Sequence, residues 1–83
     1  MSKYDPLRRY LEQSLAPEIV LSFAEIEAIL GGALPASARR HRAWWANEQT
    51  GSHSHCRSWL DAGFETTLVD FVRERLTFRK LVR

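Results

Sequence analysis

Residues 21–32, with the sequence LSFAEIEAILGG, are the strongest helix signal in the chain. Ser22 and Glu25 have the spacing of a capping box, in which the serine side chain bonds a first-turn amide and the glutamate reaches back to the serine amide. Apolar residues then recur at helical spacing, and the two glycines that follow provide a left-handed stop. We therefore expect a helix over about residues 23–30.

The segment before this helix predicts another helix and a short strand. Asp5-Pro6 has the form of an N-cap followed by proline at the first helical position. Ala16-Pro17 ends this helix, and the alternation over residues 18–21 suits a very short strand. The predicted helix has one apolar stripe, consisting of Leu7, Tyr10, Leu11 and Leu15.

The middle of the chain is also expected to be helical. Ser37 is placed to cap a short helix over residues 38–42, and the pattern allows that helix to continue through Trp44 and Trp45. A polar loop over residues 47–54 follows.

A further helix is expected to run from a capping Ser52 or Ser54 to Ala62, with Gly63 as its stop. Its inward residues are expected to be Cys56, Trp59 and Leu60.

After Gly63 the hydrophobic period changes to two. Thr67, Val69 and Phe71 alternate with their neighbours, and a second β-rich run contains Leu76, Phe78 and Leu81. Because residues 72–75 join the two runs, residues 64–82 are predicted to form a β-hairpin.

The resulting element order predicts an α+β fold, a small helical cluster closed by a C-terminal β-hairpin. This arrangement is winged-helix-like, and the short strand at residues 19–21 is placed to pair with the hairpin as a third strand. A compact α+β fold unrelated to winged helices has the same element order, and the stretch from 35 to 54 is long for a simple turn between helices.

Length and composition favour one folded domain over residues 1–83, with 45% hydrophobic and 27% charged residues. The only cysteine, Cys56, excludes an intramolecular disulfide scaffold. No apolar run approaches a membrane span and the first residues hold no apolar signal stretch, so a cytoplasmic location is expected. Because a small core needs most of the aromatic residues, a binding module is favoured over an enzyme.

Charge is distributed unevenly along the chain. Residues 1–34 hold five acidic and three basic side chains, whereas residues 35–83 hold nine basic and five acidic ones. Ten of the twelve basic residues are arginines, whose planar forks of donors suit phosphates and carboxylates. The alternative interpretation is a solvated basic face with no partner.

The first candidate binding surface lies between residues 39 and 47. Adjacent tryptophans on a helix diverge by about 100°, so one is expected in the core and the other partly exposed. An exposed tryptophan beside arginines suits contacts to phosphates and bases, or to a protein partner. The alternative is that both rings pack in the core under the arginine stems. The candidate residues are Arg39, Arg40, Arg42, Trp44, Trp45 and Asn47.

The second candidate surface is the hairpin. Arg73 and Arg75 flank its turn, where arginines commonly contact phosphates. The alternative is that these charges protect an exposed sheet edge from aggregation.

Catalysis and metal binding find little support in the sequence. His53, His55 and Cys56 form one compact cluster with only the distant His41 beside it, which is not the paired spacing of a zinc site. Cys56 is expected to face inward, where a thiol is inert. No glycine-rich phosphate loop is present. We therefore expect no enzyme activity, no metal and no cofactor.

Several blocks of the sequence resemble a small domain of unknown function similar to ones in bacteria, archaea and mobile elements. The blocks are YDPL at 4–7, LSFAEIEAILG at 21–31, Leu34-Pro35, SAR at 37–39, WWAN at 44–47 and WLDAGF at 59–64. The resemblance runs from Tyr4 to about Phe78 and implies a unit of fold without any catalytic residue. Phe64 stands where the resemblance implies a tryptophan.

We therefore expect a small non-enzymatic protein that binds nucleic acid or a nucleoprotein complex through an arginine and tryptophan surface. The alternative is a protein-targeting inhibitor from a phage or other mobile element, acting like an anti-CRISPR protein on a host defence complex. No membrane partner is expected, and both a monomer and a homodimer fit the sequence.

Overall fold

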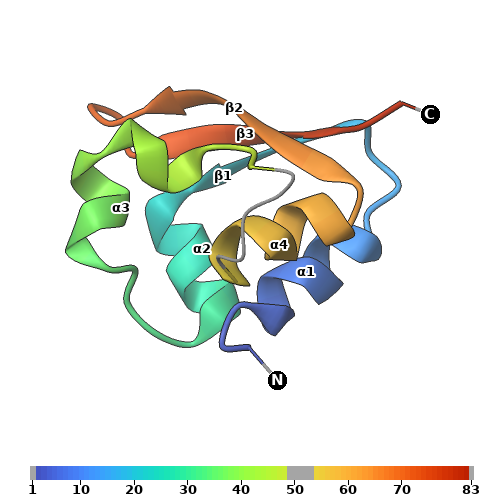
Figure 1. Ribbon diagram of the computed structural model, residues 1–83, viewed down its shortest axis with the longest axis horizontal. Coiled ribbons are helices and arrows are strands. Elements are labelled where there is room, and N and C mark those ends of the chain that lie inside the picture. The colour runs from blue at the N-terminus through green and yellow to red at the C-terminus, as the bar shows by residue number, and fades with distance from the viewer. Residues whose placement is uncertain (1, 49–53, 83) are drawn as a thin grey trace.

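A computed structural model describes residues 2–48 and 54–82. Within these ranges the chain forms helices packed against a small antiparallel sheet (Figure 1). The elements are, in chain order, α1 (Asp5–Glu12), β1 (Glu18–Ser22), α2 (Phe23–Leu30), α3 (Ala36–Arg40), the 3₁₀-helix η1 (Arg42–Trp45), α4 (Ser54–Asp61), β2 (Phe64–Asp70) and β3 (Arg75–Lys80).

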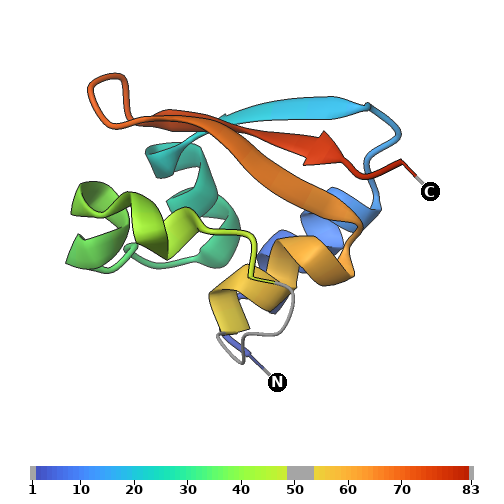
Figure 2. The same ribbon diagram turned by 45° about the horizontal axis from the view of Figure 1, so that its top comes forward.

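The three strands form one antiparallel sheet in the order β1-β3-β2. β1 pairs with β3 with Ile19 opposite Phe78, so the predicted third strand of the hairpin sheet is confirmed. The helices lie together against one face of this sheet, and none of them covers its other face in the described residues (Figure 2).

Aromatic rings fill the space between sheet and helices. Phe23 stacks on Trp45 with 5.4 Å between ring centroids, and Trp45 stacks on Trp59 at 5.9 Å. Trp59 in turn packs against Phe78 of the central strand at 6.0 Å. All four side chains are buried, so this row of rings is the centre of the core.

Helix α2 forms as the sequence predicts. The Ser22 hydroxyl accepts from the Glu25 N–H at 3.0 Å, and the Glu25 carboxylate accepts from the Ser22 N–H at 2.8 Å. Gly31 ends the helix with a φ of 75°, a left-handed conformation that glycine adopts without strain. The capping box and the glycine stop are confirmed.

Helix α1 is shorter than predicted and starts one residue earlier. Its N-cap is Tyr4 rather than Asp5, and it ends at Glu12, well before Pro17. Leu7 and Leu11 are buried, but Tyr10 is 43% exposed and Leu15 is 95% exposed, so the predicted four-residue apolar stripe is wrong for its outer half. The chain leaves the helix to bring Pro17 beside β3, where its carbonyl accepts from the Lys80 N–H at 2.8 Å.

The middle of the chain departs further from the prediction. Pro35, not Ser37, occupies the N-cap of α3, and no side chain caps that helix. His41 is extended, with φ −120° and ψ 119°, so the helix does not continue into the tryptophans. The break lets the Trp45 indole N–H fold back onto the Ala38 carbonyl at 2.7 Å, a bond that a continuous helix through these residues excludes.

The last helix and the hairpin follow the predicted order. Cys56, Trp59 and Leu60 are buried as expected, and Gly63 has a φ of 86°. The predicted Ser52 cap lies outside the described residues, and so does the side chain of Ser54. The prediction of a helix followed by a hairpin is confirmed.

One irregularity in the hairpin was not predicted. Thr67 lies opposite Thr77, but Asp70 lies opposite Arg75, so β2 holds one extra residue between these pairs. Leu68 within this bulge has a φ of 53° and is 74% exposed. Since an extra residue shifts the alternation, Val69 and Phe71 beyond it pack against the core. The predicted α+β fold class is confirmed.

Candidate functional site

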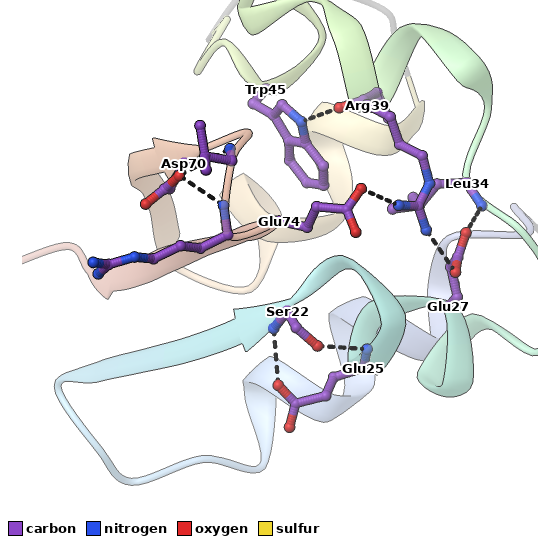
Figure 3. A network of polar contacts seen from close by, with 11 residues as sticks. Ser22, Glu25, Glu27, Leu34, Arg39, Trp45, Asp70 and Glu74 are labelled. Carbon is purple, nitrogen blue, oxygen red and sulfur yellow. Dashed lines mark hydrogen bonds and ion pairs between the residues drawn. The ribbon is translucent and has the colours of Figure 1, made fainter.

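Arg39 links helix α3 to two other elements. Its guanidinium donates to the Glu27 carboxylate of α2 at 2.9 Å and to the Glu74 carboxylate of the hairpin turn at 2.8 Å (Figure 3). Glu27 also accepts from the Leu34 N–H at 2.8 Å. These bonds lower the pKa of Glu27, the Leu34 N–H most strongly and Arg39 next, and the Glu27 contact raises the pKa of Arg39. Arg39 is therefore a structural cation whose charge is balanced within the chain.

Arg42, the first residue of η1, holds this 3₁₀-helix against the hairpin. Its guanidinium donates to the Val69 carbonyl at 3.0 Å. The guanidinium carbon also lies 5.3 Å from the centroid of the Phe71 ring, within range of a cation–π contact. These contacts hold Arg42 in place. Neither partner is an anion, so neither offsets the charge of its guanidinium.

Two acidic residues at the ends of the hairpin turn, residues 71–74, form contacts within the protein. The Asp70 carboxylate accepts from the N–H groups of Val72 and Arg73, each at 3.0 Å. These bonds, that of Arg73 first, lower the pKa of Asp70. Glu74 is occupied by Arg39. The turn is thereby fixed at both ends.

The structure brings the two sequence candidates together at one end of the molecule. The α3–η1 segment contacts the hairpin turn through Arg39 and Arg42, which join stretches far apart in the sequence. Four exposed arginines belong to these segments, and no ion pair within 4.0 Å involves them in the described residues. We call them the hairpin-end arginines: Arg40, Arg42, Arg73 and Arg75.

The tandem tryptophans separate as expected, one inside and one at the surface. Trp45 is 2% exposed and belongs to the core, which removes it from the candidates for a partner contact. Trp44 is half-buried, and one face of its ring stacks on the His55 imidazole with centroids 4.0 Å apart and planes 8° apart. In a 3₁₀-helix residues two apart point about 120° away from each other, so Trp44 does not share the side of η1 from which Arg42 reaches the hairpin.

Asn47 is a structural residue as well. Its side-chain oxygen accepts from the Trp59 indole N–H at 2.9 Å, and its amide group also bonds the backbone of Thr66. The polar atoms of its amide are therefore engaged inside the fold rather than offered to a partner.

The histidine and cysteine cluster does not assemble into a metal centre in the described residues, where no group of three or more potential ligands is found. His53 lies outside these residues. Burial raises the pKa of Cys56, and its thiol accepts from the Glu48 N–H at 3.2 Å and donates to the Ala46 carbonyl at 3.3 Å. A hollow of about 300 Å³ beside it is lined by residues that include His41, Trp44 and His55.

Sequence reasoning missed the acidic residues that organise the site. Glu27, Asp70 and Glu74 carry no motif, and their roles depend on a fold that places α2, α3 and the turn together. The spacing of Asp70 to Arg73 is the one local signal, since aspartate commonly bonds amides two and three residues on. The other two contacts have no signal in the sequence.

The fold and the arginine-rich end define a small α+β domain with an exposed cationic surface. The chain belongs to the family described as domain of unknown function DUF7662, which matches residues 4–81. No curated protein and no solved structure matches the chain. None of the helices in the described ranges has the length and apolar character that crossing a lipid bilayer requires.

Proposed function

We propose that the protein is a non-catalytic, cytoplasmic binding module that engages nucleic acid, alone or within a nucleoprotein complex, through the hairpin-end arginines. The observation that carries this proposal is the contact of α3 and η1, which hold Arg40 and Arg42, with the hairpin that holds Arg73 and Arg75. Guanidinium groups bind phosphate through paired donors, and clustered cations release counterions from a nucleic acid backbone.

The charge balance of this end supports the proposal. Three carboxylates of this end, those of Glu27, Glu74 and Asp70, each accept a hydrogen bond within the fold. Glu27 and Glu74 pair with Arg39. The pKa of Asp70 is lowered first by its bonds to the turn and then also by the charges of Arg73 and Arg75, so this carboxylate offsets part of the cluster. The side chains of Arg40, Arg73 and Arg75 are exposed, and Arg42 is held in place by its contacts with Val69 and Phe71, a preorganisation that favours binding.

The fold also supports a nucleic-acid role by its arrangement. A helical layer beside a three-stranded sheet, with the hairpin turn at the same end of the molecule as α3, is consistent with the winged-helix-like arrangement proposed from the sequence (Figures 1 and 2). A hairpin tip that carries arginine is a suitable phosphate-contacting device.

A protein-targeting inhibitor from a mobile element is the second candidate. Val72 and Leu68 are exposed beside the hairpin-end arginines, and apolar side chains next to arginine also occur at the centres of protein interfaces. A nucleoprotein defence complex offers both kinds of surface. This candidate predicts capture of one protein partner that is retained after nuclease treatment.

The test is a comparison of two double variants by fluorescence anisotropy with labelled duplex DNA at low salt. Arg40→Gln with Arg73→Gln removes two hairpin-end charges, while Arg9→Gln with Arg79→Gln removes the same charge from α1 and the far end of β3. We expect the first pair to weaken binding about tenfold or more and the second pair to weaken it much less. Equal losses for the two variants would refute a localised surface.

A further inference from the structure

The tip of the hairpin presents one apolar and one cationic side chain to solvent. Val72 is 94% exposed, and Arg73 beside it is exposed with no ion pair in the described ranges. An apolar side chain as exposed as that of Val72 does not contribute to the core and is free to contact a partner. The neighbouring Phe71, by contrast, packs against the core.

The acidic side chains on either side of the tip are hydrogen-bonded within the protein. Asp70 accepts from the two N–H groups that lead into the tip, and Glu74 accepts from Arg39. Figure 3 shows Asp70 and Glu74 engaged in these contacts on the two sides of the turn. The tip therefore offers a guanidinium and an isopropyl group beside carboxylates that already accept hydrogen bonds from the chain.

Contacts from α3 and η1 also hold the turn in place. Arg42 contacts the Val69 carbonyl and the Phe71 ring, and Arg39 ties Glu74 to helix α3. Beside the turn lies an open hollow of about 450 Å³, lined by Arg42, Leu68, Val69, Asp70, Phe71 and Val72. The turn is thus held against α3 and η1, and a hollow lined in part by the cationic Arg42 lies next to it.

We infer that the hairpin tip enters the minor groove of duplex DNA, with Arg73 in the groove, Val72 against its floor and Arg42 on the bordering phosphates. This inference rests on the proposed nucleic-acid function and specifies the groove that is read. The minor groove is about 6 Å wide, which admits a turn but not a helix. Arginine is attracted to narrow A·T-rich minor grooves, and apolar side chains commonly accompany it there.

The inference predicts a sequence preference with a distinctive chemical origin. In the minor groove a G·C pair differs from an A·T pair by the 2-amino group of guanine. Inosine lacks that group. An I·C duplex therefore keeps the major-groove pattern of G·C but presents the minor-groove pattern of A·T. A protein that reads the minor groove should therefore treat I·C as A·T.

The experiment measures anisotropy with three labelled duplexes of equal length, composed of A·T, G·C and I·C pairs, at one fixed low salt concentration. We expect the A·T and I·C duplexes to bind about fivefold or more tightly than the G·C duplex. Arg73→Ala should remove most of this preference, whereas the control Arg9→Ala on α1, which also removes one exposed arginine, should preserve it. Circular dichroism checks that both variants are folded.

The contrary outcomes separate this inference from the proposed function. Equal, salt-sensitive binding to all three duplexes overturns the minor-groove inference and leaves the proposed function standing. Binding of I·C like G·C places the readout in the major groove and also overturns it. Absence of binding to every duplex at low salt overturns the inference together with the direct form of the proposed function.

Discussion

The side-chain amide of Asn47 pairs with the backbone of Thr66 as a neighbouring strand would. Its Nδ2 donates to the Thr66 carbonyl at 3.0 Å, and its Oδ1 accepts from the Thr66 N–H at 2.9 Å. Because β2 is an edge strand, these two groups otherwise face outward. Together with the Arg42 bond to the Val69 carbonyl, the amide covers part of the edge of β2.

Asn47→Ala is expected to destabilise the fold by about 2 kcal/mol, since it leaves the Trp59 indole N–H and the Thr66 backbone without these partners. The measurement is urea unfolding, with Glu48→Ala as a neighbouring control that should change stability by less than about 0.5 kcal/mol. Size-exclusion chromatography should also show more self-association for Asn47→Ala, because part of the strand edge is uncovered. Equal stability of the two variants would contradict the structural role of Asn47.

The two tryptophans should differ in their response to truncation. Trp45→Ala removes a buried ring from the centre of the core and is expected to cost about 3–5 kcal/mol. Trp44→Ala removes a half-buried ring that stacks on His55, so its cost should be clearly smaller and the protein should remain folded. Thermal unfolding followed by circular dichroism checks this order, and the reverse order would mean that the two rings are assigned wrongly.

Stability should fall in acid partly through Glu27. The folded state lowers the pKa of Glu27 relative to the unfolded chain, so its contribution is fully present above the ordinary glutamate pKa. The contribution is lost as pH falls through the ordinary value and down to the lower folded value. Glu27→Gln should therefore reduce stability near neutral pH and make it less dependent on pH in the acid range.

The control for this prediction is Glu12→Gln on α1. Glu12 is exposed and its contact with Arg8 is a long surface ion pair of 3.7 Å, which contributes little. Its unfolding profile against pH should match that of the unchanged protein. A Glu27→Gln profile that also matches would show that the contacts to Leu34 and Arg39 do not stabilise the fold.

The fold was predictable where the signals are local. The capping box of Ser22 and Glu25, the left-handed Gly31 and the hairpin period lie within a few residues of the elements they specify, and each is confirmed. The end of α1 and the break at His41 were not predictable, because contacts with distant parts of the chain determine both. The bulge at Leu68 has no glycine to mark it.

The candidate surface was predictable only in composition. The sequence identified the arginines, but the roles of Arg39, Trp45 and Asn47 inside the fold depend on partners 7 to 35 residues away. A sequence alone does not show whether a charged or amide side chain bonds another part of the chain or faces solvent. The contact between η1 and the hairpin turn distinguishes these cases, and it requires the folded chain.

The most direct test of the central claim is the salt dependence of duplex DNA binding by the unchanged protein. If the hairpin-end arginines contact phosphates, the logarithm of the binding constant should fall linearly with the logarithm of salt concentration, with a slope of about −3.6 for four contacts. A slope near zero, or no binding at low salt, would contradict the account.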